Sequence, residues 1–300
     1  MRTLYRIWQN ALMEWTGAVR SRRALVLLAL YLVFAVGCMY VTISILGKME
    51  VELAKLLQLP ASDQTGVVSA TLWKSKPFQR MIHSAVSSEL VYHDIVGRHP
   101  VELMYGFFAF FFAPLLVMLV AGNRIADDLR SGAVRYSIVR CTRAEWTLGK
   151  YLGQTLMIAL ALAISAVGAW LVAVCRLSGT DVWALLPAML GWGLRAWIYS
   201  LAWVGVALGA SHCTRSGSWA TVFGILLLAG LAMLPNLLKL TGSWLGMPWV
   251  ENFNVIAPST VENYLWRRSF APLAVAAFSL LTLGLAYLAL GYAFFRRRDA

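Results

Sequence analysis

Long stretches without a charged side chain constrain this sequence of 300 residues more than any other feature. Hydrophobic residues make up 60% of the chain and charged residues only 13%, against about 25% charged in soluble domains. Each stretch reaches the roughly 20 residues that a helix needs to cross a bilayer. They cover residues 24–47, 103–123, 151–175, 216–238 and 269–295, and a sixth, 182–214, is interrupted only by Arg195 and His212.

The sequence therefore predicts an all-α polytopic membrane protein, with six transmembrane helices in one domain, 1–300. Hydrocarbon offers no water to backbone groups, and a helix satisfies those groups internally. An N-terminal amphipathic interfacial helix and a helical external loop complete this prediction. The expected boundaries are 1–23 for the interfacial helix, about 24–47, 103–123, 151–175, 187–211, 216–238 and 270–295 for the spans, 48–102 for the external loop, and 124–150 for a cytoplasmic loop.

The N-terminal segment carries apolar residues at helical spacing. Leu4, Trp8 and Trp15 recur on one side, and Arg2 and Arg6 lie elsewhere around the helix. This pattern fits a helix lying in the membrane interface, with Trp at headgroup depth and Arg toward anionic lipid. The alternative is a frayed extension.

The net charge of +12 is distributed by segment. Lys and Arg are concentrated in the N-terminal arm, in 124–150 and in the arginines at 296–298, whereas acids nearly balance them in the external loops. Since Lys and Arg are enriched in short cytoplasmic loops, we expect both termini in the cytoplasm. The charge thus sets topology, and no nucleic-acid motif accompanies it.

Three residues within the spans are candidates for a substrate path. Arg195 is costly in a span unless it is paired or faces water, which makes it a functional hypothesis. Alternatively, 185–187 forms a separate interfacial turn, and Arg195 only reaches the outer headgroups. Phe107 and Phe111 belong to a phenylalanine-rich run that lines a hydrophobic route or, alternatively, only packs between helices.

No reactive constellation indicates an enzyme. The sequence contains no GxSxG, HExxH or GxxxxGK[ST] motif, so it predicts neither a nucleophile elbow nor a phosphate-binding loop. His83, His93 and His99, with Glu89 and Asp94, lie in one external loop. We expect a solvated loop face there, and no metal site.

The charged segment 122–153 contrasts with the stretches around it, because it carries nine charged residues. It resembles the cytoplasmic loop of the ATP-binding-cassette (ABC) transporter type 2 permease family. That family places an acidic residue after its second span, then Gly-Thr, then Pro-x-x-Arg, and a closing Gly-Lys. Asp128, Gly132, Arg143 and the pair at 149–150 stand at these positions, and Ala133 and Arg140 replace the Thr and the Pro.

The resemblance extends to the whole chain, including the broken apolar segment at 235–268. It implies a multi-pass permease subunit in a bacterial cytoplasmic membrane, acting as a homodimer or heterodimer. Two copies of a separate ABC ATPase would bind ATP and Mg²⁺, so this chain would be a non-catalytic subunit without a cofactor.

A short coupling helix, roughly 125–136, would seat in a groove of each ATPase. Charged side chains would form the rim of that contact, and Ile125, Leu129 and Val134 an apolar anchor. The alternative is a plain charged loop that only fixes topology. The candidate coupling residues are Ile125, Asp127, Asp128, Leu129, Arg130, Gly132, Arg135 and Arg143.

These expectations lead to an exporter of a hydrophobic or amphipathic substrate, driven through the loop 124–150. The substrate would pass near the second and fifth spans, where the resemblance places it. The alternative is an ABC-type mechanotransmitter, which passes ATP-driven motion to an extracytoplasmic partner in an assembly or maturation system. An ATP-independent carrier or membrane enzyme has no supporting motif.

Overall fold

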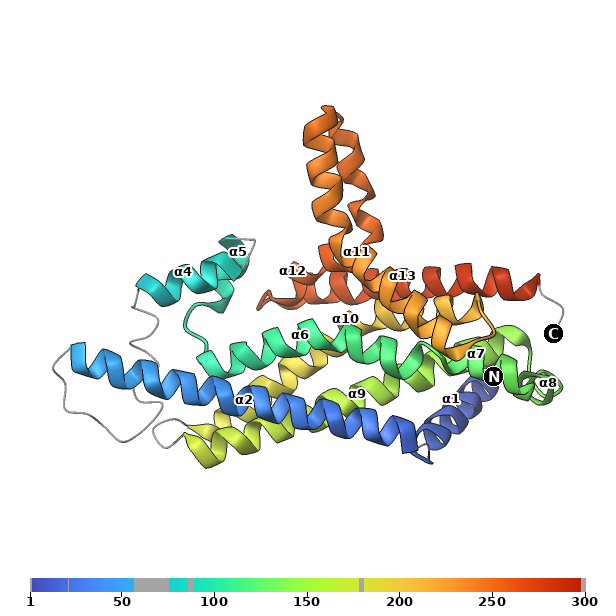
Figure 1. The fold of residues 1–300 in the computed structure, drawn as a ribbon, viewed down its shortest axis with the longest axis horizontal. Coiled ribbons are helices and arrows are strands. Elements are labelled where there is room, and N and C mark those ends of the chain that lie inside the picture. The colour runs from blue at the N-terminus through green and yellow to red at the C-terminus, as the bar shows by residue number, and fades with distance from the viewer. Residues whose placement is uncertain (1, 21, 57–75, 86–88, 178–180, 298–300) are drawn as a thin grey trace.

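The computed structural model describes residues 2–20, 22–56, 76–85, 89–177 and 181–297 (Figure 1). Every regular element in these ranges is a helix, and six are long and apolar enough to cross a membrane, which confirms the predicted fold class. The six are α2 (Arg22–Leu56), α6 (Pro100–Ala121), α9 (Arg143–Arg176), α10 (Val182–His212), α11 (Gly217–Leu245) and α13 (Phe270–Arg296). The shorter elements are α1 (Arg2–Arg20), α4 (Lys76–Ala85), α5 (Glu89–Ile95), α7 (Arg124–Ser131), α8 (Ala133–Ile138), α12 (Glu262–Leu265) and the 3₁₀ helices η1 (Pro248–Ile256) and η2 (Pro258–Thr260).

Helix α10 forms the centre of the bundle. It packs against α6, α9, α11 and α13, and 78% of its most apolar stretch is buried, against 6% in α11. The helices α2, α6, α9, α10 and α13 run along the long axis of the molecule (Figure 1). One end of the bundle carries α1, α7 and α8, and the other carries α4 and α5.

Glycines bring α10 and α13 into close backbone contact. A Cβ atom on Gly205 would collide with the backbone of Gly284, and one on Gly291 would lie 2.5 Å from the Cα of Gly209. Small residues at such crossings allow the helix backbones to approach, which is how helices associate where lipid removes the hydrophobic driving force. The Gly-x-x-x-Gly spacing of Gly205 and Gly209 is visible in the sequence.

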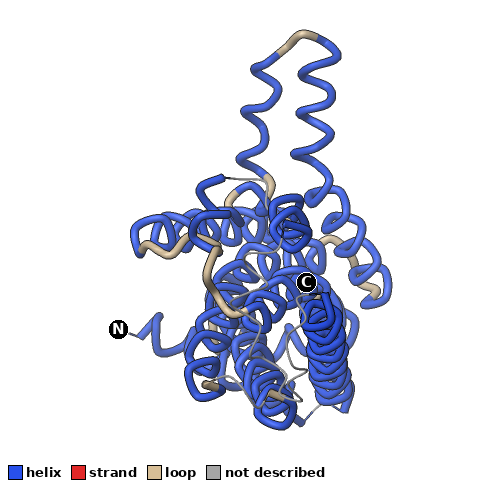
Figure 2. Tube along the Cα trace, turned by 90° about the vertical axis from the view of Figure 1, so that its left-hand side faces the viewer, coloured by secondary structure: helices blue, strands red, loops and turns tan. Residues whose placement is uncertain are grey.

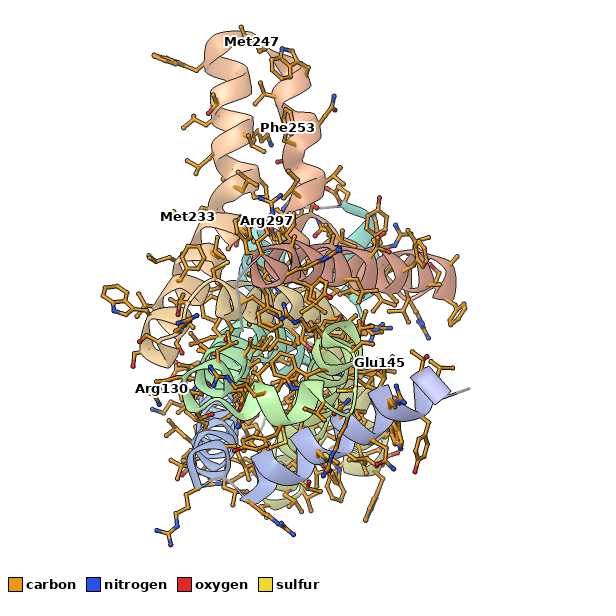
Figure 3. The ribbon with its side chains drawn as sticks, turned by 90° about the vertical axis from the view of Figure 1, so that its right-hand side faces the viewer. Arg130, Glu145, Met233, Met247, Phe253 and Arg297 are labelled. Atoms are coloured by element: carbon orange, nitrogen blue, oxygen red, sulfur yellow. The ribbon has the colours of Figure 1, made fainter. Side chains whose placement is uncertain are left out.

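Helix α11 turns away from the bundle in its second half. Pro235 lies inside the helix and removes one backbone hydrogen bond, which accounts for a bend near Met233. The outer part of α11 and η1 then form a hairpin that stands off the other helices, with Met247 at its tip (Figures 1, 2 and 3). The apolar, Pro-broken sequence of 235–268 predicts short re-entrant or interfacial helices buried against the spans. In the structure, Trp249 and Phe253 of η1 are instead 59% and 50% exposed.

Several helices differ in extent from the sequence prediction. Helix α9 begins at Arg143, before the predicted residue 151, because Thr142 and Glu145 form a capping box. Helix α10 begins at Val182 and continues through Pro187, so 185–187 is not a separate turn.

The external loop also differs from its predicted form. The apolar spacing over 51–57 predicts a separate short helix, whereas in the structure α2 continues as far as Leu56. The spacing of Ile82, Val86 and Leu90 predicts a second helix, and the described residues on either side of 86–88 form α4 and α5. Residues 57–75 and 86–88 lie outside the described part of the chain.

Candidate functional site

The loop between the second and third spans folds into two short helices, where the sequence predicted one over 125–136. Helix α7 ends at Gly132, whose φ of +75° lies in the left-handed region that only glycine adopts readily. Helix α8 starts immediately afterwards. Gly132 therefore turns the chain between two charged helices.

The apolar residues of this loop hold it to the bundle. Ile125 is fully buried, Val134 is 2% exposed, and Leu129 is packed partly buried against the core. The backbone N–H of Ala126 also donates to the Oγ of Ser211 on α10, at 2.9 Å. Hence Ile125 and Val134 do not face outward as the expected anchor for a partner, because they fasten the loop to its own protein.

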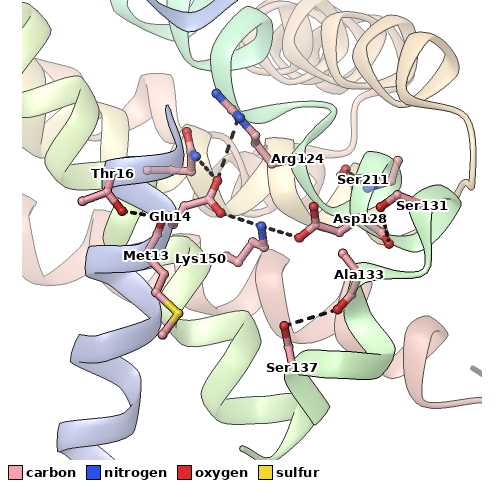
Figure 4. Close-up of polar contacts among 12 residues, drawn as sticks. Met13, Glu14, Thr16, Arg124, Asp128, Ser131, Ala133, Ser137, Lys150 and Ser211 are labelled. Carbon is pink, nitrogen blue, oxygen red and sulfur yellow. Dashed lines mark hydrogen bonds and ion pairs between the residues drawn. The ribbon is translucent and has the colours of Figure 1, made fainter. Parts of the chain in front are cut away.

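Lys150 joins three elements at the base of the loop (Figure 4). Its Nζ lies 2.5 Å from Oε2 of Glu14 on α1 and 2.6 Å from Oδ2 of Asp128 on α7. Gln154 donates from Nε2 to Oε1 of Glu14 at 2.7 Å, and Nε of Arg124 lies 3.9 Å from the same oxygen. We call Glu14, Arg124, Asp128, Lys150 and Gln154 the base network.

The base network balances its charges away from water. It contains two carboxylates and two cations, and the side chains of Glu14 and Lys150 are only 10% and 8% exposed. Burial raises the pKa of Glu14, but Lys150 and Arg124 outweigh that effect and leave the pKa below its ordinary value. Glu14 therefore stays ionised and ties α1 to the loop.

Two glycines let α1 reach the base network. A Cβ atom on Gly149 would collide with the Cβ of Asn10 and lie 3.0 Å from the carbonyl oxygen of Ile7. One on Gly153 would lie 2.9 Å from the Cβ of Glu14. The Gly-Lys pair that closes the charged segment thus has a physical role, because its glycine admits α1 and its lysine binds the carboxylate of α1.

Further contacts attach the end of the loop to its neighbours. Arg6 of α1 lies 3.8 Å from Glu145, whose carboxylate also accepts the backbone N–H of Thr142 at 2.8 Å. The guanidinium carbon of Arg143 lies 5.4 Å from the ring centre of Phe295 on α13, a cation–π contact. Arg143 therefore contacts the last span and does not belong to the outer surface of the loop.

The outer surface of the loop consists of basic and apolar side chains. Tyr136 is 82% exposed and Val139 is 85% exposed. Arg130, whose side chain is 70% exposed, lies 3.5 Å from Asp127, which also accepts the amide of Asn123 at 2.5 Å. We call Arg130, Arg135, Tyr136, Val139 and Arg140 the loop surface; all five are exposed.

The sequence did not lead us to predict some residues of the loop surface and of the base network. It treated Tyr136 only as a helix end and did not consider Val139, although two exposed apolar residues three positions apart among arginines are a signal for a contact surface. It also passed over Glu14, the only acidic residue before Glu50. An isolated acid on an apolar amphipathic helix indicates a paired partner elsewhere.

The three candidates for a substrate path do not lie in one place in the structure. Phe107 and Phe111 line a cavity of about 840 Å³ beside α10 and α11. Arg195 is not among the described residues that line it. The guanidinium of Arg195 lies 4.7 Å from the ring centre of Trp192, a cation–π contact. Arg98, which precedes the start of α6, makes a second cation–π contact with the same ring at 5.0 Å.

The histidines of residues 83–99 do not form one cluster in the described part of the chain. His83 Nε2 lies 3.2 Å from Glu89 Oε1, whereas His99 caps α6 by accepting the N–H of Val101 at its Nδ1. Within the described ranges, no three His, Cys, Asp or Glu side chains are placed to hold a metal ion. Burial lowers the pKa of His99, which keeps the ring neutral and able to accept in this cap.

We compared the whole chain with known proteins and protein families. A search of curated proteins finds no match. The family model described as ABC-2 family transporter protein matches residues 8–300 and so includes α7, α8 and all six long helices. The chain therefore belongs to the ABC-2 transporter family, whose members are membrane permease subunits of ABC transporters.

Proposed function

We propose that this chain is the permease subunit of an ABC exporter and that the loop surface receives force from a separate ATPase. In this proposal both termini and the loop lie in the cytoplasm of a bacterium, and two permease copies pair in the inner membrane. ATP and Mg²⁺ bind the two ATPase subunits. The exposure of Tyr136 and Val139 at the tip of a braced loop is the observation that carries the proposal.

The composition of the loop surface supports a protein partner. A lone apolar side chain on a surface needs no explanation, but Tyr and Arg are enriched at the energetic centres of protein interfaces. Here Tyr136 and Val139 provide apolar contact, and the guanidinium groups around them pair with carboxylates of a partner. An acidic groove with an apolar floor is the matching surface.

The connections of the loop support transmission of force. A push on α8 reaches α7 across Gly132, α1 and α9 through Lys150, and α10 through Ser211. Because these contacts are short and largely shielded from water, the loop moves together with the helices that hold it. Such a coupled group can alternate between two packings, and the nucleotide state of the ATPase would favour one of them.

The loop surface can be tested without disturbing its attachment. We expect the double variant Tyr136→Ala/Val139→Ala to fold normally, because both side chains are exposed. Binding of a cognate Walker-motif ATPase should fall by at least about tenfold, since truncating two central contacts commonly costs more than 1.4 kcal/mol. Co-purification and ATP-dependent transport in vesicles measure the effect.

The matched control is Leu4→Ala/Tyr5→Ala, which removes an exposed apolar pair from α1, where the residues are 74% and 64% exposed. This control should bind the ATPase like the parent protein. Equal co-purification of the ATPase with the loop variant and the parent would contradict the proposal.

A further inference from the structure

The cavity beside α10 has an aromatic wall. Its volume of about 840 Å³ lies within the range of ligand pockets, about 300–1,000 Å³. It is bounded by α6, α10, the bend of α11, η2 and α12. The aromatic residues that line it are Phe107, Phe110, Phe111, Tyr199, Trp203 and Trp266.

The rings of this wall hold one another in place. The ring centre of Trp266 lies 4.6 Å from that of Phe107 and 5.0 Å from that of Phe110, and Phe110 lies 5.6 Å from Tyr199. Packed rings present π-faces and edges at fixed positions. A cation over such a face is attracted by the ring quadrupole, and the attraction grows when water is excluded.

A single carboxylate faces the same cavity. Among the described lining residues Glu262 is the only acid, and none is Lys, Arg or His. Trp266 donates from Nε1 to Oε1 of Glu262 at 3.3 Å, and no cationic side chain in the described ranges forms an ion pair with Glu262. The nearby acid Asp94 is already paired, since its Oδ2 lies 2.6 Å from Arg267.

Holding an ionised carboxylate away from water without a cationic partner costs free energy. Burial raises the pKa of Glu262, although hydrogen bonds from Trp266 and Tyr199 oppose that rise. A cationic ligand would supply the missing partner. By contrast, a second cavity of about 800 Å³ between α2 and α6 is lined by apolar groups and has no charged side chain to select a ligand.

We propose that the Glu262 cavity binds a hydrophobic monocation, such as an amine or quaternary cation that carries an apolar body. The cation pairs with the carboxylate of Glu262, and the apolar body packs on Phe110, Trp203 and Trp266. Asn236 and Asn263 at the lining offer amide groups to polar substituents. An anion of the same shape is rejected, because Glu262 repels it and no lining cation compensates.

Only the identification of this ligand as transported cargo rests on the proposed function. Binding itself needs no ATPase, so the two ideas fail separately. If the cation binds but no ATPase couples to the permease, the binding site is supported and the transport role is refuted. If an ATPase couples normally but no cation binds, only the binding site is refuted.

Two ions of matched shape test the site. Tetraphenylphosphonium and tetraphenylborate differ mainly in charge, and their binding to the full-length protein in nanodiscs is measured by equilibrium dialysis, with empty nanodiscs subtracted. We expect the parent protein to bind the cation at least about tenfold more tightly than the anion. Glu262→Gln keeps the acceptor for Trp266 and removes the charge, so it should weaken cation binding by at least about tenfold.

The matched control is Glu251→Gln, which removes an exposed carboxylate on η1 that does not line the cavity. It should bind the cation like the parent protein, and thermal unfolding should show that both variants are folded. Equal affinity of the parent for the two ions, or unchanged cation binding by Glu262→Gln, would overturn the proposal.

Discussion

Lys150 shows how one residue connects the loop to two other elements. It lies between carboxylates of α1 and α7, and neither it nor Glu14 is open to water. Burying one charge alone is expensive, whereas a group that pairs each charge keeps the cost low. Removing the charge of Glu14 would leave Lys150 and Arg124 with Asp128 as the one remaining carboxylate of the base network, so the network is sensitive to the protonation of Glu14.

The depressed pKa of Glu14 predicts acid-dependent stability. A carboxyl with a folded-state pKa below its unfolded value of about 4.3 contributes stability above that pH and loses it as the pH falls through the folded value. Glu14→Gln should unfold about 3 kcal/mol more easily at pH 7 and show little further change between pH 5 and 3. Thermal unfolding in detergent over that range measures the difference.

The control for this prediction is Glu251→Gln, which alters an exposed acid on η1. Its unfolding temperature should follow that of the parent at every pH. If Glu14→Gln and the parent kept the same difference in stability from pH 7 to pH 3, the ionised pairing of Glu14 would be refuted.

Some residues of the base network could be predicted from the sequence and others could not. Asp128 and Lys150 lie in a local pattern of acid, glycine and base, so the sequence identified that segment. Glu14 lies 136 positions from Lys150, and only the fold brings the two together. Ile125 and Val134 were assigned to the wrong side, because a short helix of mixed composition does not reveal which face meets its own protein.

At the scale of elements, α1 depends on close packing against α9. It lies along the start of α9, where Gly149 and Gly153 leave room for its backbone. The amphipathic pattern of residues 1–23 predicted a helix and a membrane interface. It did not predict that this helix docks on the third span.

Substituting Gly149 tests this docking. Alanine normally stabilises a helix interior relative to glycine by about 0.5–1 kcal/mol. In Gly149→Ala the new Cβ meets Asn10 and the Ile7 carbonyl, so we expect a loss of about 1–3 kcal/mol instead. Thermal unfolding in detergent reports the sign directly.

Gly191→Ala is the matched control, because a Cβ at Gly191 on α10 has no heavy atom within 4 Å. That variant should be as stable as the parent or slightly more stable. A stabilising effect of Gly149→Ala would show that α1 does not pack against α9 at this distance.

Element boundaries depended on local chemistry that a hydropathy pattern does not contain. The capping box of Thr142 and Glu145 starts α9 among charged residues, and Pro187 lies within α10 without ending it. The direction in which α11 bends could not be predicted from the sequence. Pro235 marks the position of the bend, but the packing around it decides the direction.

At the scale of the whole molecule, the structure connects a surface at one end of the bundle with a cavity beside the middle of α6 and α10. Helix α7 of the loop attaches to α10 through the bond from Ala126 to Ser211, and Tyr199 of α10 lines the cavity with Glu262. Helix α10 is thus the shared element through which a change at the loop can reach the cavity. The six-helix class was predictable because hydrocarbon permits few structures, whereas this connection required the fold.

Crosslinking in cells tests whether the loop surface contacts an ATPase. A photoactivatable amino acid is placed at Tyr136 or Val139, and at Phe253 as an exposed aromatic control on the hairpin that stands off the bundle. We predict that positions 136 and 139 form adducts with a Walker-motif ATPase, identified by mass spectrometry, and that position 253 does not. Absence of that adduct at 136 and 139, or its formation at 253, would contradict the account.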